Sequence, residues 1–389
     1  MENANNTFPV VLITGPRQVG KTTILEHNLS LNRQYITLDD PQIRSLANTD
    51  PSLFFQTYEP PILIDEIQYA PELFPYIKMI VDRKKQKGLF WLTGSQQFHL
   101  MKNITESLAG RVAILNLQGL SQCEKLQRKS ETFTTELKKI KLQMNVKEIY
   151  EYILRGSFPA LFADKNMSWK LFYDSYLKTY IERNIRSILN VSSEHDFLKF
   201  LCIIAARTGQ LINYSEVSKE VRVSVNTVKS WISVLETSGL IYLLQPYSSN
   251  YISRTVKTPK LYFLDTGLCC YLSGWETVET LSNGAMSGAI LETYVFSEII
   301  KSYWHNGKSL KIYFYRDLAK REIDFLIEEN DTFYPIEVKK TASPVPNDVK
   351  NFSILEDAKL NIGKGAVICF SNNSIPLDKD VNIIPVPSL

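Results

Sequence analysis

The sequence predicts an α/β protein with an N-terminal parallel sheet, a largely helical middle and a C-terminal α/β domain. Up to about Ser121, short apolar runs alternate with helix-compatible stretches, which is the pattern of a parallel sheet whose strands are joined by helices. From Val146 to about Phe200 the pattern is helical and aromatic, and strand-like alternation returns from Lys311. At 389 residues the chain is long enough for two or three domains.

Five strands are expected in the N-terminal part, near residues 10–14, 34–39, 62–65, 89–93 and 112–117. The first of them runs directly into an unbroken G-x-x-x-x-G-K-T segment, which opens onto a helix-compatible stretch. In such a loop, successive backbone N–H groups surround phosphate oxygens, and the helix directs its positive N-terminal end at them. The residues expected to hold the nucleotide are Gly15, Pro16, Arg17, Gln18, Val19, Gly20, Lys21, Thr22 and Thr23.

This phosphate loop predicts a P-loop NTPase domain that uses ATP and Mg²⁺. Lys21 is expected to reach the β- and γ-phosphates, and the Thr22 hydroxyl is expected to ligate Mg²⁺. A chance match in an ordinary loop is the alternative, but strand, loop and helix follow one another in the order that the site requires.

A second metal ligand and a general base are expected at the end of the strand at 62–65. Its three apolar residues indicate a strand buried on both faces. Asp65 and Glu66 follow at the carboxyl end, where ligands bind in open α/β sheets. We expect Asp65 to hold Mg²⁺ through water and Glu66 to polarise the attacking water. An acidic turn after a core strand is the plainer interpretation, and the phosphate loop upstream favours the catalytic one.

Two further residues complete the expected nucleotide site. The strand at 89–93 is followed by Ser95, whose hydroxyl could sense the γ-phosphate from the neighbouring strand tip. Arg111 stands immediately before the strand at 112–117. In these features the chain resembles the AAA+ ATPases, in which a polar residue ends the strand after the acidic pair and an arginine precedes the fifth strand.

The resemblance implies that Arg111 acts in trans, on nucleotide held by a neighbouring subunit, and that the protein works as a homo-oligomer. Such an arginine finger stabilises the charge that develops on the transferred phosphoryl group. A surface arginine at a helix C-terminus, favoured by the helix dipole, is the alternative interpretation.

Composition restricts the possible functions. Lys plus Arg number 44 against 41 for Asp plus Glu, so no global basic field indicates nucleic-acid binding and any such contact must be local. The amino terminus lacks a basic segment followed by an apolar core, and no run approaches the roughly 18 apolar residues of a membrane span. We therefore expect a cytoplasmic protein with no membrane partner. The five cysteines form no C-x-x-C pair, so neither a zinc site nor a disulfide framework is expected.

The helical middle carries a distinctive order of residues. Residues 154–161 read LRGSFPAL, Trp169 follows, and residues 176–186 read YLKTYIERNIR. This order resembles the linker region of a bacterial and archaeal family in which an AAA-type ATPase domain is fused to a C-terminal domain of unknown function. The aromatic residues are expected to form a core, and the charged residues at 182–186 a set of structural ion pairs.

A winged helix-turn-helix is expected between Leu211 and Leu264. One helix is expected to be capped by Ser215, and a second at 225–237 by Ser224, and two strands of a wing then follow.

The expected reading face of the second helix carries little charge. Only Lys229 and Arg222 contribute to it, so a phosphate-contacting surface would be thin. Winged helices also serve as protein-interaction modules, and both DNA and a protein stay open as partners.

The last hundred residues hold a second chemical pattern. Asp324 begins one expected strand, and Glu337 and Lys339 lie two residues apart on the next, so they share one face. A helix expected at 288–300 contributes Glu292. The spacing D-x12-E-x-K resembles the PD-(D/E)xK nuclease superfamily, which has a restriction-endonuclease-like fold whose first helix often supplies an acid.

In this pattern Asp324 and Glu337 would hold a divalent metal through hard oxygen ligands. Lys339 would orient or deprotonate the attacking water, or steady the scissile phosphate. Acidic and basic residues on an edge strand are frequent, and the fold persists in members that only bind, so an inactive site is the alternative.

The expected domains are an AAA-type P-loop ATPase domain at 1–122, a linker and helical region at 123–205, a winged helix-turn-helix at 206–265 and a PD-(D/E)xK nuclease-like domain at 266–389. The predicted function is ATP hydrolysis coupled to a DNA-directed, nuclease-like output. The alternative is an ATP-dependent regulatory switch or scaffold that binds protein partners, with an inactive nuclease-like domain. The residues expected to act in catalysis are Glu66, Arg111, Ser95, Glu292, Asp324, Glu337 and Lys339.

Overall fold

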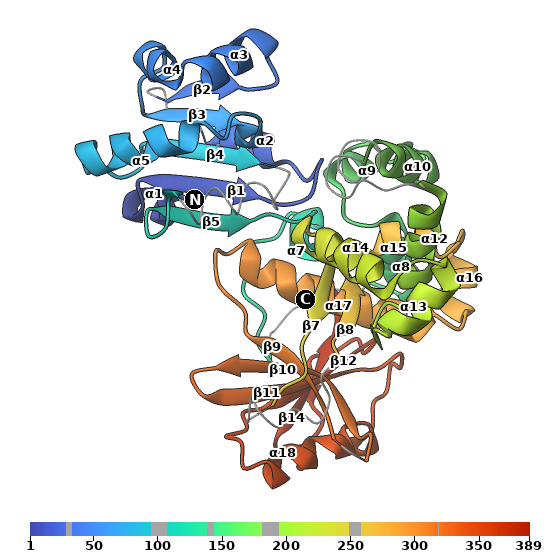
Figure 1. Ribbon diagram of the computed structural model, residues 1–389. Coiled ribbons are helices and arrows are strands. Elements are labelled where there is room, and N and C mark those ends of the chain that lie inside the picture. The colour runs from blue at the N-terminus through green and yellow to red at the C-terminus, as the bar shows by residue number, and fades with distance from the viewer. Residues whose placement is uncertain (29–32, 95–106, 138–143, 181–193, 249–257, 318) are drawn as a thin grey trace. The chain divides into compact units, whose positions relative to one another are not determined.

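The computed structural model describes residues 1–28, 33–94, 107–137, 144–180, 194–248, 258–317 and 319–389. The chain divides into two compact units. The N-terminal unit comprises residues 1–119 with the short segment 237–239, and the second unit comprises residues 120–236 and 240–389. In Figure 1 the strands of the N-terminal unit run from blue to cyan, and those of the C-terminal sheet from orange to red.

A five-stranded parallel sheet forms the centre of the N-terminal unit, and its arrows lie side by side in Figure 1. The strands are β1 (Val10–Thr14), β2 (Gln34–Thr37), β3 (Ile62–Asp65), β4 (Phe90–Gly94) and β5 (Val112–Asn116). They lie in the order β2-β3-β4-β1-β5, and every pair is parallel. The N-terminal parallel sheet predicted from the sequence is thus confirmed.

The helices of this unit connect or flank the strands. They are α1 (Glu2–Thr7), α2 (Lys21–His27), α3 (Pro41–Thr49), α4 (Pro51–Thr57) and α5 (Leu73–Lys84), with the 3₁₀ helix η1 (Ile67–Tyr69). Asp40 and Asp50 cap α3 and α4, because their carboxylates accept hydrogen bonds from backbone N–H groups of the first turn. A proline at the first position of each helix has a φ that already suits a helix.

The apolar strand runs of this sheet are buried on both faces. Successive strand residues point to opposite sides, so β1, β3 and β4 fill two cores at once. One core contains Val10, Leu12, Ile62, Ile64, Phe90 and Leu92, and the other Val11, Ile13, Leu63 and Trp91.

Strand β4 lies between β1 and β3, and this order positions the nucleotide site. Leu92 is in register with Leu12 on one side and with Ile64 on the other, so the carboxyl ends of the three strands are level. The loop after β1, the acidic pair after β3 and Thr93 near the end of β4 therefore meet at one edge of the sheet.

The second unit begins with helices and a small sheet. The helices are α7 (Gln122–Lys125), α8 (Val146–Arg155), α9 (Pro159–Ala163), α10 (Trp169–Tyr180), α12 (Glu194–Ala205), α13 (Tyr214–Val221), α14 (Val225–Thr237), α15 (Thr266–Leu272), α16 (Val278–Asn283) and α17 (Ser287–Trp304). An antiparallel sheet in the order β6-β8-β7 consists of β6 (Gln210–Leu211), β7 (Ile241–Leu244) and β8 (Lys260–Phe263). No helix in the described ranges is long and apolar enough to span a membrane.

The helix caps between α12 and β7 differ in part from the expectation. Asn213, not Ser215, caps α13, because its side chain accepts from Ser215 N and Glu216 N. Ser224 caps α14 as predicted, with its Oγ accepting from Thr227 N at 3.0 Å. An Asn side chain caps a helix as well as Ser does, so residue type alone could not choose between two neighbouring candidates.

The C-terminal sheet has six strands in the order β13-β14-β12-β11-β10-β9. They are β9 (Ile312–Arg316), β10 (Glu322–Glu329), β11 (Thr332–Val338), β12 (Gly365–Cys369), β13 (Ile375–Pro376) and β14 (Val381–Pro385), with η3 (Pro346–Ser353), α18 (Ile354–Asp357) and η4 (Val386–Ser388) beside them. Strands β9, β10 and β11 are antiparallel, whereas β11, β12 and β14 are parallel. Tyr247, which precedes these strands in the sequence, pairs with the edge strand β9. Its backbone N–H donates to Phe314 O at 2.7 Å.

The buried carboxylate of Asp265 connects distant segments of the second unit. Its Oδ2 accepts from Ser157 N at 2.7 Å and from Ser157 Oγ at 2.6 Å. Its Oδ1 accepts from Tyr173 OH at 2.6 Å and from Leu268 N at 2.7 Å. The LRGSFPAL segment, α10 and the start of α15 are therefore held by one side chain.

Asp265→Asn is expected to lower the free energy of unfolding of the second unit by about 3 kcal/mol, because an amide NH₂ would face donors and leave buried groups unpaired. Urea unfolding followed by tryptophan fluorescence would show it, since four of the five tryptophans lie in this unit. Asp164→Asn, at an exposed position, is the control. Equal midpoints for the two variants would contradict this role for Asp265.

Candidate functional site

The phosphate loop joins β1 to α2, as its sequence predicts. A Cβ on Gly15, where φ is 151°, would lie 1.9 Å from Leu117 O, so only glycine fits. Gly20 is left-handed, with a φ of 92°, and stands at the N-cap of α2. A Cβ built on Gly20 has no atom beyond its chain neighbours within 4 Å. The loop thus leaves open space beside the first turn of α2, whose N–H groups lack helical partners.

Lys21 is buried against this loop, with 7% of its surface exposed. Its Nζ donates to Pro16 O at 2.7 Å and to Gly15 O at 3.2 Å. Burial lowers the pKa of Lys21 to about 8, while Glu66 and Asp65 act in the opposite direction. A partly desolvated ammonium group next to open space is suited to bind an anion such as a phosphate.

Asp65 is the centre of the polar contacts at this edge. Thr22 Oγ1 lies 3.1 Å from each of its carboxylate oxygens. Tyr35 OH donates to its Oδ2 at 3.0 Å, and Thr93 Oγ1 donates to its Oδ1. The two expected metal ligands, Thr22 and Asp65, are therefore in direct contact, and their hard oxygen atoms fit Mg²⁺.

Glu66 follows β3 in a left-handed conformation, with a φ of 55°. Its backbone N–H donates to Thr93 Oγ1 at 3.1 Å, and its Oε2 accepts from Gln68 Nε2. Backbone strain of this kind costs about 1–3 kcal/mol and is concentrated at functional sites. The carboxylate is thus held by a neighbouring amide next to the Thr22 and Asp65 pair.

Sequence reasoning missed Tyr35, Gln68 and Thr93. Thr93 carried a usable signal, because it is the last polar side chain of β4 and the strand order brings it beside Asp65. Tyr35 and Gln68 carried none, because their contacts depend on the pairing of β2 with β3 and on the turn after β3. Ser95, the predicted γ-phosphate sensor, lies outside the described residues.

Arg111 lies at the amino ends of the strands, opposite the carboxyl ends where the phosphate loop lies. Its carbonyl accepts from Val10 N at the amino end of β1, whereas the phosphate loop follows the carboxyl end. Its guanidinium forms a two-point ion pair with Asp82, with Nε to Oδ1 at 2.6 Å and Nη2 to Oδ2 at 3.1 Å. Arg111 therefore points to Asp82 and away from the phosphate loop of its own chain.

Four carboxylates come together in the second unit, and we call Glu292, Glu322, Asp324 and Glu337 the C-terminal acidic cluster. Asp324 on β10 lies opposite Glu337 on β11, one step beyond the pair Phe325↔Ile336. Asp324 Oδ2 accepts from Val338 N at 2.9 Å, and the next residue, Lys339, donates to Glu337 Oε1 at 2.7 Å. The structure thus places the predicted residues Glu292, Asp324, Glu337 and Lys339 in one site.

Burial and mutual repulsion shape the electrostatics of the C-terminal acidic cluster. The pKa of Glu337 is raised, first by burial and then by Asp324, and the pKa of Glu292 is raised by the same two causes. Glu337 is 6% exposed, and its Oε2 is buried without a hydrogen-bond partner. A buried carboxylate oxygen with nothing to accept from is a position that a cation would satisfy.

Sequence reasoning missed Lys260, Tyr262 and Glu322 at this site. Lys260 Nζ lies 2.6 Å from Glu322 Oε1 and 3.4 Å from Glu292 Oε1. Tyr262, two residues along β8, donates to Glu292 Oε1 at 2.5 Å. Burial opposes the charge on Lys260, but the surrounding carboxylates outweigh it and raise its pKa. Across the described part of the chain, no three His, Cys, Asp or Glu side chains are arranged to hold a metal ion together.

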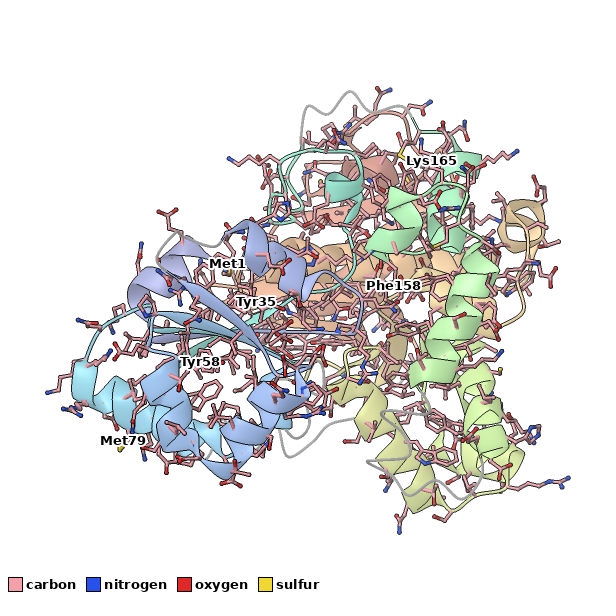
Figure 2. All side chains as sticks on the ribbon, turned by 90° about the horizontal axis from the view of Figure 1, so that it is seen from above. Met1, Tyr35, Tyr58, Met79, Phe158 and Lys165 are labelled. Carbon is pink, nitrogen blue, oxygen red and sulfur yellow. The ribbon has the colours of Figure 1, made fainter. Side chains whose placement is uncertain are left out.

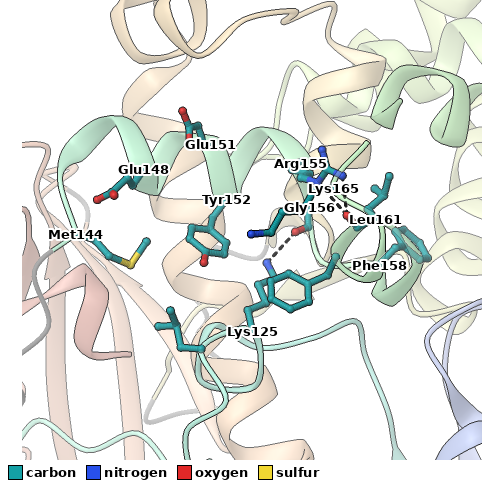
Figure 3. A pocket seen from close by; sticks show the side chains of 12 residues that line it. Lys125, Met144, Glu148, Glu151, Tyr152, Arg155, Gly156, Phe158, Leu161 and Lys165 are labelled. Atoms are coloured by element: carbon teal, nitrogen blue, oxygen red, sulfur yellow. Dashed lines mark hydrogen bonds between the residues drawn. The ribbon is translucent and has the colours of Figure 1, made fainter. Parts of the chain in front are cut away.

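A separate cavity of about 520 Å³ lies among α7, α8 and α9 in the second unit (Figure 3). Its walls include Tyr152, Phe158 and Leu161. Lys125 Nζ donates to Gly156 O at 2.7 Å, as the dashed line in Figure 3 shows, and burial lowers the pKa of Lys125 to about 8. None of the predicted catalytic residues lines this cavity. Figure 2 labels Phe158 among the side chains of the second unit and Tyr35 among those of the N-terminal unit.

The strand order, the phosphate loop and the Thr22 and Asp65 contact define the N-terminal unit as a P-loop nucleotide-binding domain. Residues 7–126 match the family model of an AAA domain, and this unit is an AAA-type ATPase domain. Residues 146–279 and 287–389 match the models of two domains of unknown function (DUF8612 and DUF4143).

Relatives with similarity along the whole chain include uncharacterized proteins of Mycobacterium tuberculosis (strain ATCC 25618 / H37Rv) and Mycobacterium bovis (strain ATCC BAA-935 / AF2122/97). Each is 26% identical over 391 residues, covering 100% of this chain and 82% of its own length. The Thermotoga maritima RuvB Holliday junction branch migration motor aligns with 60% of this chain and 82% of its own, at 15% identity and a TM-score of 0.26. A Vibrio cholerae protein covers 97% of this chain and 94% of its own, at 12% identity and a TM-score of 0.20.

Proposed function

We propose that the chain hydrolyses ATP with Mg²⁺ at the phosphate loop and that the nucleotide state controls the second unit. The observation that supports ATP hydrolysis is the contact of Thr22 with Asp65, because it joins the two expected metal ligands beside Lys21 and Glu66. The open space at Gly20 gives the phosphates a place next to the first turn of α2.

In this mechanism each side chain has one task. Bound Mg²⁺ would neutralise charge on the phosphates. Lys21 exchanges its bonds to Pro16 O and Gly15 O for bonds to phosphate oxygens, and Glu66 takes a proton from the attacking water. Gln68 holds the Glu66 carboxylate, and Thr93 is the polar side chain next to both acids.

We assign Arg111 to the site of a neighbouring subunit in a homo-oligomer. It is partly exposed and lies at the amino ends of the strands, away from its own loop, so it can serve nucleotide bound by another chain and not by its own. Its ion pair with Asp82 would hold the guanidinium until that neighbour is present.

For the output, we propose a DNA-directed, nuclease-like function of the C-terminal acidic cluster. Its support is the cross-strand pair of Asp324 and Glu337, the unpartnered Oε2 of Glu337 and the ammonium of Lys339 beside it. A divalent cation held by Asp324 and Glu337 would supply a Lewis acid for phosphodiester cleavage. Lys339 would then orient the attacking water or the scissile phosphate.

Asp324→Ala is expected to abolish Mg²⁺- or Mn²⁺-dependent cleavage of DNA, because the variant loses a carboxylate that the metal needs. A plasmid cleavage assay with added metal, compared with metal chelated, measures it. Asp331→Asn is the matched control, since Asp331 is an exposed acid in the turn after β10 and Asn tolerates its left-handed backbone. Cleavage that survives Asp324→Ala would refute the nuclease function.

A second function has support of its own. Lys260 already neutralises two acids of the C-terminal acidic cluster, as expected of an inactive site. The chain would then be an ATP-dependent switch that binds a protein partner. DNA binding that weakens steeply with salt favours the nuclease-like function, and no DNA binding at low salt favours the switch.

A further inference from the structure

Lys260 and the C-terminal acidic cluster come from distant parts of the sequence. Lys260 belongs to β8 of the three-stranded sheet, Glu292 to α17 and Glu322 to β10 of the six-stranded sheet. The Lys260 side chain is 4% exposed, and its ammonium lies within 3.4 Å of both carboxylates. The two carboxylates offset the cost of taking this ammonium out of water.

The two arms of the cluster differ in how far they are satisfied. The first arm, Glu292 with Glu322, receives Lys260, and Glu292 also receives the Tyr262 hydroxyl. The second arm, Asp324 with Glu337, keeps a buried carboxylate oxygen without a partner, although Lys339 reaches the other oxygen of Glu337. One arm is therefore filled by a cation of the chain itself, and the other keeps a carboxylate oxygen that an added cation could satisfy.

We propose that the Lys260 ammonium takes the place of a divalent cation at the Glu292 and Glu322 arm, so that the cluster binds a single added metal ion, at Asp324 and Glu337. This inference rests on the metal site of the proposed function. It assigns to Lys260 the role of setting the number of metal ions that the cluster accepts. It also makes Glu292 and Glu322 partners of Lys260 and not metal ligands.

The physical reason is competition for the same oxygen atoms. A divalent cation needs about six oxygen ligands close to it. Both oxygens of Glu322 face a cation of the chain, with Lys260 2.6 Å from Oε1 and Arg316 3.2 Å from Oε2, and these charges repel a metal ion. Lys339 reaches only Oε1 of Glu337, and Oε2 keeps no partner. Removing the ammonium while keeping the aliphatic stem takes the cation away from Glu322 Oε1 and Glu292 Oε1, and leaves the Arg316 guanidinium at Glu322 Oε2 as the counter-charge for both acids. A divalent cation would then be the simplest way to neutralise them.

The test compares Mn²⁺ binding by the full chain and by Lys260→Met, counted by titration calorimetry without nucleotide. The expected result is one additional Mn²⁺ per chain in Lys260→Met, and loss of that addition in the double variant with Glu322→Gln. Mn²⁺ should also raise the thermal midpoint of Lys260→Met more than that of the parent. The same Mn²⁺ count and the same thermal shift in both proteins would overturn the proposal.

A variant that keeps Lys260 tests the inference if Lys260→Met does not fold. Glu322→Gln alone should leave Mn²⁺ binding unchanged, because Glu322 is not a ligand when Lys260 is present. Weaker Mn²⁺ binding by Glu322→Gln would overturn the assignment of that arm to Lys260. Failure of the proposed nuclease function is distinct from both results, since it appears as absent cleavage by a parent protein that still binds Mn²⁺ and loses that binding in Asp324→Ala.

Discussion

Glu66→Gln is expected to keep Mg²⁺-ATP binding and to lower the rate of phosphate release at least about 100-fold, the lower range of what a general base contributes. The amide keeps the shape of the side chain but cannot accept a proton from water. The Glu66 carboxylate accepts a hydrogen bond from Gln68, and Glu66 contacts Thr93 through its backbone N–H, so the change should not disturb the metal ligands.

Phosphate release at saturating ATP and a separate measurement of nucleotide affinity together show whether Glu66 acts as a general base or contributes to nucleotide binding. Glu59→Gln, at an exposed position of the same unit, is the control. Equal turnover by Glu66→Gln and the parent would remove Glu66 from the chemical step.

Arg111→Ala is expected to lower turnover about 1,000-fold, the lower range for an arginine finger, while nucleotide affinity stays as in the parent. The reason is that Arg111 would act only on charge that develops during phosphoryl transfer. Asp82→Asn is the matched control, because it removes the ion pair of Arg111 and keeps the arginine. If the ion pair is merely structural, the two variants should behave alike.

Mixing experiments show whether Arg111 acts in trans. Subunits with Arg111→Ala keep an intact phosphate loop, and subunits with Glu66→Gln keep an intact arginine. Mixed oligomers of the two should regain part of the turnover, since some interfaces would combine both intact residues. A mixture as inactive as its components would contradict a site shared between subunits.

Most of the nucleotide site could be predicted because its residues are close together in the sequence or follow apolar strands. The loop from Gly15 to Thr22 is a local pattern, and Asp65 and Glu66 follow a run whose composition already indicates a buried strand. Tyr35 escaped prediction, because its contact with Asp65 depends on which strand is the neighbour of β3. Strand order is a tertiary property, and composition does not determine it.

Prediction of the C-terminal acidic cluster was limited even more by contacts that depend on tertiary structure. The spacing of Asp324, Glu337 and Lys339 is visible because β10 and β11 form one hairpin. Lys260 comes from a different sheet, and no spacing rule relates it to Glu292 or to Glu322. Lys260 has the largest effect on the chemistry of the cluster, because its ammonium group lies next to two of the four carboxylates, Glu292 and Glu322.

We infer that the loop from Gly15 to Thr22 binds Mg²⁺-ATP through Lys21. The most direct measurement is titration of the parent and of Lys21→Ala with Mg²⁺-ATP, with Lys78→Ala as an exposed control in the same unit. We predict saturable binding by the parent and by Lys78→Ala, and none by Lys21→Ala at the same concentrations. Binding by Lys21→Ala with the affinity of the parent would contradict a nucleotide site that depends on Lys21.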